Sequence, residues 1–147
     1  MNQAIEDFVG GKRIALVGMS RSGKNKFGNS AYTELIGRGY QVYPVHPSAQ
    51  EIDGVRCYPN LASLPEKVDG LLVVVPPAQA KQVLQDAAQA GIRNVWLQQG
   101  AESPEVVALG QQLGLNLVSQ KCILMYAPPV RSFHGFHRFF VKLIGQY

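Results

Sequence analysis

A short apolar segment at residues 14–17 runs directly into a polar, cationic, glycine-containing loop at residues 18–24. The loop residues with suitable chemistry for binding an anion are Gly18, Ser20, Arg21, Ser22 and Lys24. In α/β proteins, a buried strand that ends in such a loop before a helix presents backbone N–H groups to a phosphate. Residues 18–24, called the phosphate loop below, therefore predict a phosphate-binding site; a simple turn with solvated cations is the alternative interpretation.

The phosphate loop matches the first seven positions of the Walker A pattern, Gly-x-x-x-x-Gly-Lys, but fails at the eighth. Asn25 stands where that pattern has a Ser or Thr that binds magnesium. Residues 25–28 also separate the loop from the next helical pattern, and no apolar segment ends in the Asp of a Walker B motif. Nucleotide hydrolysis is therefore disfavoured.

The dinucleotide fingerprint Gly-x-Gly-x-x-Gly is matched only in part, because Ser20 replaces its central glycine. The next β-rich segment, residues 41–47, ends in His46 and Pro47, where an NAD-binding protein has an acid for the ribose hydroxyls. An NAD site is thereby disfavoured, whereas a ribose that carries an extra phosphate is tolerated. His46 itself is either a ligand contact or an ordinary loop histidine.

Apolar segments that alternate with helical patterns define the organisation of the chain. The predicted strands are residues 14–17, 41–47, 69–76, 94–100 and 115–122. The predicted helices begin at a cap on Asn29 or Ser30, at Pro77 and at a cap on Ser103, and end at Gly39, Gly91 and Gly114. This alternation predicts an α/β fold with a doubly wound, mostly parallel five-stranded sheet and helices on both faces. Such sheets bind ligands at the carboxyl ends of the strands, where strand order reverses.

Several local patterns allow more specific predictions. The residues expected on the buried face of the first predicted helix are Ala31, Leu35 and Ile36. Asp53 and Gly54 predict a turn, and residues 61–65 predict a single helical turn. Trp96, centred in an apolar strand, is expected in the core. The first eleven residues suggest no chemistry.

The composition of the 147 residues fits one globular domain with an anionic small-molecule partner. The formal net charge is +4, but no block of Lys and Arg marks a nucleic-acid-binding face. Cys57 and Cys122 lie far apart and match no metal-ligand spacing, so free thiols in a reducing cytoplasm are expected, with Cys122 buried rather than nucleophilic. No apolar run is long enough to span a bilayer.

The carboxy-terminal residues 126–147 form a basic and aromatic segment. Its apolar residues at helical spacing are Phe133, Phe136, Phe140 and Leu143, and its cations are Arg131, Arg138 and Lys142. This amphipathic pattern predicts packing on the domain or in a homodimer, with an acidic membrane surface as the alternative. His134 and His137 lack a third ligand and make a poor metal site.

Five segments in order resemble the CoA-binding domain family, small single-domain Rossmann-like proteins similar to the amino-terminal domain of the succinyl-CoA synthetase α subunit. They are residues 15–20, 39–47, 69–77, 95–100 and 114–118. The resemblance covers most of the chain and implies a CoA-binding domain at residues 1–125, with residues 126–147 as an extension. It implies that the phosphate loop holds the diphosphate of CoA.

The same resemblance implies further ligand contacts. The residues assigned to the adenosine side are His46 and Pro47, and those lining the rest of the ligand are Val75, Pro76, Pro77, Gln98 and Gly100. Many relatives have an Asn where this chain has His46. They have an Arg after the third strand where this chain has Pro76 and Pro77, and these two prolines resemble the synthetase form of the segment.

The resulting prediction is a protein that binds CoA or an acyl-CoA without transforming it. The alternative is an enzyme, either an NADP-linked oxidoreductase or a fragment of an acyl-CoA ligase. A ligase needs a phosphorylatable His and a second domain, and a reductase needs a substrate domain, for which this chain is too short. A regulatory protein that senses acyl-CoA through its aromatic segment is the third possibility.

Overall fold

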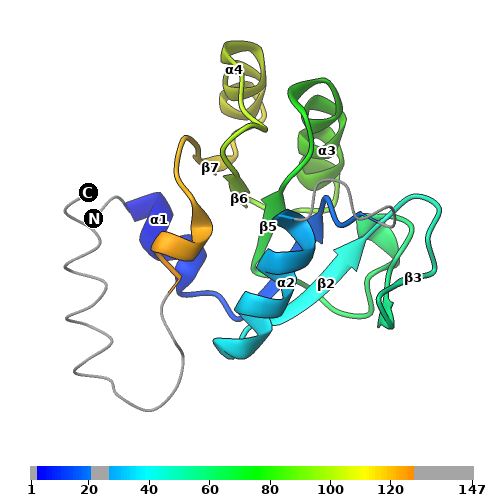
Figure 1. Ribbon diagram of the computed structural model, residues 1–147. Helices are drawn as coiled ribbons and strands as arrows, with labels where there is room; N and C mark the ends of the chain where they lie inside the picture. The colour runs from blue at the N-terminus through cyan, green and yellow to red at the C-terminus, as the bar shows by residue number, and fades with distance from the viewer. Residues whose placement is uncertain (1–2, 21–26, 128–147) are drawn as a thin grey trace, which may run out of the picture.

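The computed structural model of the chain describes residues 3–20 and 27–127 (Figure 1). At its centre lies a five-stranded sheet in the order β2-β1-β5-β6-β7, in which every neighbouring pair is parallel. The strands are β1 Arg13–Val17, β2 Gln41–Val45, β5 Gly70–Val73, β6 Asn94–Leu97 and β7 Asn116–Val118. The predicted doubly wound α/β fold is confirmed.

Helices cover both faces of this sheet (Figure 1). They are α1 Gln3–Val9, α2 Phe27–Gly37, α3 Pro77–Gln89 and α4 Pro104–Gln112, with short 3₁₀ helices η1 Leu61–Ser63 and η2 Ile123–Met125. Successive strand residues point to opposite faces, so Leu72 packs with α1, α2 and η2, whereas Leu71 packs with α3 and α4. Because both faces are covered, all four residues of β5 are buried, as their continuous apolar pattern predicts.

Trp96 is fully buried, which confirms its predicted place in the core. Its ring lies edge-on to Phe8, with centroids 5.3 Å apart, and 5.8 Å from the ring of Tyr126. The indole N–H donates to the carbonyl of Lys121 at 3.0 Å, so the single polar atom of this side chain is satisfied. Phe8 belongs to α1, a helix that the sequence pattern did not reveal, and Gly70 leaves the space that its ring occupies.

Two predictions about α2 are wrong. The helix has already begun at Phe27, so neither Asn29 nor Ser30 is its cap. Ile36 is 42% exposed, because it points away from the sheet while Ala31 and Leu35 are fully buried. Two predicted strands are longer than the observed ones. The strand predicted at residues 69–76 ends before Pro76, which cannot donate a hydrogen bond to a neighbouring strand. The strand predicted at residues 94–100 ends before Gly100, which has a φ of 98°.

The segment between β2 and β5 carries the predicted turn and the predicted helical turn. A hairpin of β3 Glu51–Ile52 and β4 Val55–Arg56 reverses at Asp53 and Gly54, whose φ values are 51° and 80°. Residues 61–63 form η1, capped by the Asn60 side chain. Across the described parts of the chain, no helix has the length and hydropathy required to cross a membrane.

Candidate functional site

The switch point of the sheet lies between the carboxyl ends of β1 and β5. From β1 the chain continues to β2 on one side, while β5 pairs on the other side. The helices that follow these two strands, α2 and α3, lie on opposite faces of the sheet. Open parallel sheets bind their ligands in the crevice between two such strand ends. Gly18 follows β1 and Val74 follows β5, so the start of the phosphate loop lies at this crevice.

Two glycines allow the backbone to close tightly at the crevice. Gly18 has a φ of 136°, and a Cβ there would lie 2.6 Å from the carbonyl oxygen of Val74. Gly28, in the first turn of α2, would place a Cβ 2.4 Å from the carbonyl oxygen of Gly18. The close approach of helix and strand that a dinucleotide fingerprint assigns to its third glycine is therefore made by Gly28. In the fingerprint that begins at Gly18, the third glycine position falls on Gly23, five residues before Gly28.

The amide of Asn29 fastens the start of the phosphate loop to α2. Its Oδ1 accepts from the backbone N–H of Ser20 at 2.9 Å, and its Nδ2 donates to the Ser20 carbonyl at 3.1 Å. Nδ2 also donates to the carboxylate of Asp53 at 3.2 Å. The β3-β4 hairpin therefore returns an acid to the edge of the site, which the motif at the end of β2 did not predict.

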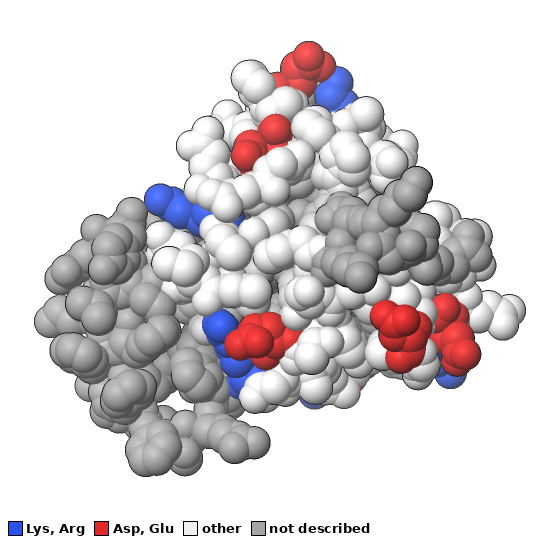
Figure 2. Space-filling view, viewed as in Figure 1, with Lys and Arg blue, Asp and Glu red and all other residues white. Residues whose placement is uncertain are grey.

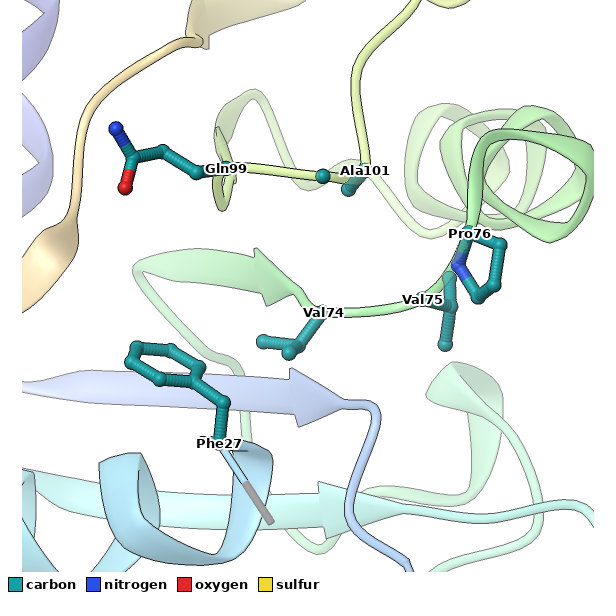
Figure 3. Close-up of a pocket in the computed structure, with 7 residues that line it drawn as sticks. Phe27, Val74, Val75, Pro76, Gln99 and Ala101 are labelled. Atoms are coloured by element: carbon teal, nitrogen blue, oxygen red, sulfur yellow. The ribbon is translucent and has the colours of Figure 1, made fainter. Parts of the chain in front are cut away.

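A pocket of about 170 Å³ opens beside the first residue of α2, at the carboxyl ends of β5 and β6 (Figure 3). The residues lining it are Phe27, Val74, Val75, Pro76, Gln99, Gly100 and Ala101. Three of these, Val75, Pro76 and Gly100, were predicted site residues. Phe27 was missed, because only the folded chain brings the first residue of α2 to the ends of β5 and β6. The walls are mostly apolar, with one amide side chain.

Gln98, a predicted ligand contact, is not among the residues lining this pocket. Its side chain is buried, and its Oε1 accepts from the backbone N–H of Ile123 at 3.0 Å, which fastens η2 to the sheet. The signal for this was available: Gln98 lies two residues after Trp96 and so shares its face of the sheet. Gln99, with the opposite orientation, lines the pocket.

His46 and Pro47 lie directly after β2, at the same edge as the crevice. Nδ1 of His46 accepts from the backbone N–H groups of Ser48 and Ala49, at 3.1 and 2.9 Å. The ring therefore organises its own turn, and with Nδ1 as acceptor the neutral imidazole carries its proton on Nε2. Pro47 is exposed.

Of the remaining predicted site residues, one lies in the described part of the chain and three lie outside it. Pro77 is the first residue of α3 and is half-buried. Arg21, Ser22 and Lys24 lie outside the described residues. So does the basic segment from residue 128 onward, for which packing on the domain or in a homodimer was predicted. Figure 2 shows charged side chains of both signs in small groups over the described surface on this side, without a basic patch.

Cys122, predicted to be buried, is half-buried at the cap of η2; Cys57 is buried, which raises the pKa of its thiol. A hydrogen bond to Glu66 raises the pKa of Tyr43 to about 12. Within residues 3–20 and 27–127, no cluster of His, Cys, Asp or Glu is arranged to hold a metal ion.

The parallel sheet, the glycine at the switch point and the close helix behind it define a Rossmann-like α/β protein. The chain belongs to the CoA binding domain family, whose sequence profile it matches over residues 12–128. The match includes the phosphate loop and all five strands of the sheet. The family predicted from five ordered segments is thereby confirmed.

Relatives of two sizes resemble the chain. It is 27% identical over 130 residues to the α subunit of the ADP-forming acetate–CoA ligase II of Pyrococcus furiosus, covering 81% of the chain and 28% of that subunit. A conserved hypothetical protein of the same organism has a TM-score of 0.71 and 37% identity, covering 77% of this chain and 97% of that one. A hypothetical protein from Pyrococcus horikoshii has a TM-score of 0.75 and 29% identity, covering 84% of this chain and 87% of that one. The chain thus spans about a quarter of the ligase subunit but nearly all of the small proteins.

Proposed function

We propose that this chain binds coenzyme A or an acyl-CoA across the carboxyl ends of its parallel strands, with the diphosphate held by the phosphate loop. The observation that carries the proposal is the family match over a segment containing the entire loop and the strand ends on both sides of the crevice. Gly18 and Gly28 support it, since they bring the loop backbone and the start of α2 together without side chains.

The ligand then extends in two directions from the loop. Its adenosine lies toward the end of β2, beside His46 and Pro47, and its remainder lies over the ends of β5 and β6. Arg21, Ser22 and Lys24 supply the positive charge and donors that a diphosphate requires. The net charge of +4 favours an anionic ligand of this kind, and the location we propose is a reducing cytoplasm, in keeping with two free cysteines.

Binding without chemistry is the role that the described pocket supports. Its walls supply apolar groups, backbone and one amide, none of which is a strong nucleophile or general acid. The ligases that resemble this chain are far longer, so their activity does not transfer with the domain. We also propose that residues 126–147 pack on the domain or in a homodimer. Measuring the molar mass by light scattering, with and without these residues, tests whether they form a homodimer.

A nicotinamide dinucleotide is the alternative ligand, and Asp53 is the observation that favours it. The hairpin holds this carboxylate beside Asn29 and hence beside the loop, where an acid can accept from ribose hydroxyls. Because Asp53 already accepts from Asn29, we place it with the structure that supports the loop. Oxidation of NADPH by the purified protein would contradict a purely binding role.

Isothermal titration of loop variants tests where the diphosphate binds. Arg21→Ala and Lys24→Ala are each expected to weaken CoA binding about tenfold, because each removes a charge-assisted contact. Lys67→Ala, an exposed cation that precedes β5 at the opposite end of the sheet, is the matched control and should bind like the wild type. Equal affinities in all four proteins would contradict the assignment of the loop.

A further inference from the structure

The two edge strands of the sheet, β2 and β7, differ in what their outer backbone groups can bind. On the outer side of β2, Pro44 has no N–H, and its carbonyl accepts from the N–H of Tyr58 at 2.9 Å. The N–H of His46, directly after the strand, donates to the carbonyl of Tyr58 at 2.8 Å. A proline and a covering segment are two of the means by which proteins protect a sheet edge from a second chain. β2 is therefore closed to another strand along these residues.

β7 lies at the other edge of the sheet, and its outer side is open. Asn116 donates its backbone N–H to the carbonyl of Arg93 at 2.7 Å, so its backbone polar groups face β6. Since backbone direction alternates along a strand, the N–H and carbonyl of Leu117 face away from the sheet, as do the Leu115 carbonyl and the Ser119 N–H. Within residues 3–20 and 27–127, no strand or loop pairs with these outer groups.

The sequence around β7 lacks the residues that normally protect such an edge. Residues 106–120 contain no charged side chain and no proline. Three leucines of this segment, Leu113, Leu115 and Leu117, are half-buried against α4 and the core beneath it, and therefore keep part of their apolar surface exposed. An uncharged edge strand beside partly exposed leucines is a template for pairing with another chain.

We infer that β7 is a dimerisation edge, which pairs antiparallel with β7 of a second copy of this chain about a two-fold axis at Leu117. The N–H and carbonyl of Leu117 then bond to those of Leu117 of the partner subunit. The Ser119 N–H donates to the carbonyl of Leu115 of the partner subunit, and the reverse bond follows from the symmetry. The Leu115 N–H is not required, because it already donates to the carbonyl of Gly110 at 3.0 Å.

A folded second copy suits this edge better than an extended peptide. β7 has only three residues, Asn116–Val118, so pairing with the strand alone buries far less than the roughly 1,200 Å² that a stable interface requires. A folded copy adds the surfaces of α1 and α4, both of which contact β7. A two-fold axis perpendicular to the sheet brings α4 and its leucines beside the same elements of the other copy. Apolar surface against apolar surface is typical of homodimers.

Light scattering of the 147-residue chain and its variants tests the inference. The wild type should be a dimer at micromolar concentration. Leu117→Lys should be a monomer, because it places two like charges opposite each other at the axis. Ser119→Pro should also be a monomer, because it removes an outer N–H. Ile36→Lys is the matched control: it adds the same charge to an apolar residue that is 42% exposed on α2, a helix that covers β1 and β2, and it should remain a dimer.

Thermal unfolding separates loss of the dimer from loss of the fold. The Tm of the wild type and of Ile36→Lys should rise with protein concentration, as it does for a dimer that dissociates on unfolding. The Tm of Ser119→Pro should be independent of concentration, with unfolding still cooperative. Because the Ser119 N–H faces away from the sheet, Ser119→Pro provides the test even if Leu117→Lys does not fold.

A disulfide tests the register of the two strands. In an antiparallel sheet, the Cα atoms of a directly opposed, hydrogen-bonded pair lie about 5.5 Å apart, which a disulfide can span. Leu117→Cys should therefore cross-link to its own copy under mild oxidation. Ile36→Cys and the wild type, which retain Cys57 and Cys122, should not cross-link.

The outcomes are independent of whether the chain binds CoA. A dimer that is lost in Ser119→Pro, retained in Ile36→Lys and cross-linked in Leu117→Cys is the expected result. A wild type that is monomeric throughout the micromolar range would overturn the inference. A dimer that persists in Leu117→Lys and Ser119→Pro would also overturn it and would favour an interface through residues 126–147.

Discussion

The side-chain amide of Asn29 forms hydrogen bonds with both backbone polar groups of Ser20, accepting from its N–H and donating to its carbonyl. The residue at the start of the phosphate loop is thus fixed to the first turn of α2. Because the Ser20 N–H is engaged by Asn29, this N–H is not a donor for the ligand. Asp53 in turn accepts from the Asn29 side chain and orients it from the hairpin.

Asn29→Ala should therefore weaken both folding and binding. Losing the two bonds to Ser20 is expected to lower the free energy of unfolding by about 1–2 kcal/mol and the affinity for CoA several-fold. Urea denaturation and calorimetric titration measure the two effects. Thr33→Ala, one turn further along the same helix and exposed, should change unfolding by less than about 0.5 kcal/mol. Wild-type affinity in Asn29→Ala would show that the loop does not depend on this bridge.

Gly28→Ala tests the close approach of α2 to the start of the loop. Its Cβ would lie 2.4 Å from the carbonyl oxygen of Gly18, a backbone atom that cannot rotate away. We expect destabilisation of about 1–3 kcal/mol in urea unfolding, as for other overpacked sites. Gly37→Ala is the control: a Cβ there meets nothing within 4 Å, and replacing a helical glycine should stabilise by up to about 1 kcal/mol. If the two variants behaved alike, the packing at Gly28 would be misassigned.

The parts of the fold that could be predicted are those whose signals are local. β5 is apolar at every position because both of its faces are covered, and α4 begins at a Ser-Pro pair whose Ser103 side chain caps the Val106 N–H. α1 could not be predicted in this way. It has only seven residues, and its stability comes from packing Ile5 and Phe8 against a sheet formed by distant segments.

The candidate site shows the same division. The loop, the two prolines after β5 and Gly100 followed from the rule that ligands bind at strand carboxyl ends. Phe27 and Asp53 did not, because their relation to the site depends on where a helix and a hairpin come to lie. The orientation of Gln98 was also predictable, since alternation from Trp96 places its side chain on the buried face, where it accepts from Ile123.

Asp69 should make stability sensitive to acid. Its carboxylate accepts from the backbone N–H groups of Arg13 and Lys12, at 3.0 and 2.9 Å, and these bonds lower its pKa. A lowered folded-state pKa means that the contribution is complete above the unfolded value of about 4 and is lost as the pH falls through the folded value.

Asp69→Asn should accordingly lower the free energy of unfolding by about 1 kcal/mol at pH 7, a modest value because the side chain is exposed, and by less at pH 3. Urea unfolding at several pH values measures this difference. Asp86→Asn, in which the acid accepts only from Gln82 within α3, should leave the acid sensitivity of the wild type intact. If the loss of unfolding free energy in Asp69→Asn did not shrink in acid, the lowered pKa of Asp69 would not be the source of the acid sensitivity.

Arg38 joins the end of α2 to the last described part of the chain. Its Nη1 donates to the carbonyl of Leu124 at 2.9 Å and to that of Ala127. Arg38→Ala should destabilise by about 1–3 kcal/mol and increase hydrogen exchange at residues 123–127, because two partly buried carbonyls lose a charged donor. Arg93→Ala, which loses one exposed bond to Gly114, should leave exchange at these residues unchanged. Unchanged hydrogen exchange at residues 123–127 in Arg38→Ala would show that Arg38 does not hold this segment.

The nucleotide that the site prefers is the central claim, and titration of the wild-type protein tests it most directly. CoA, 3′-dephospho-CoA, NAD and NADP share a diphosphate and an adenosine but differ in the arm and in the ribose phosphate. We expect CoA to bind more tightly than either nicotinamide dinucleotide by calorimetry. Tighter binding of NAD than of CoA, with Asp53 serving the ribose, would contradict it.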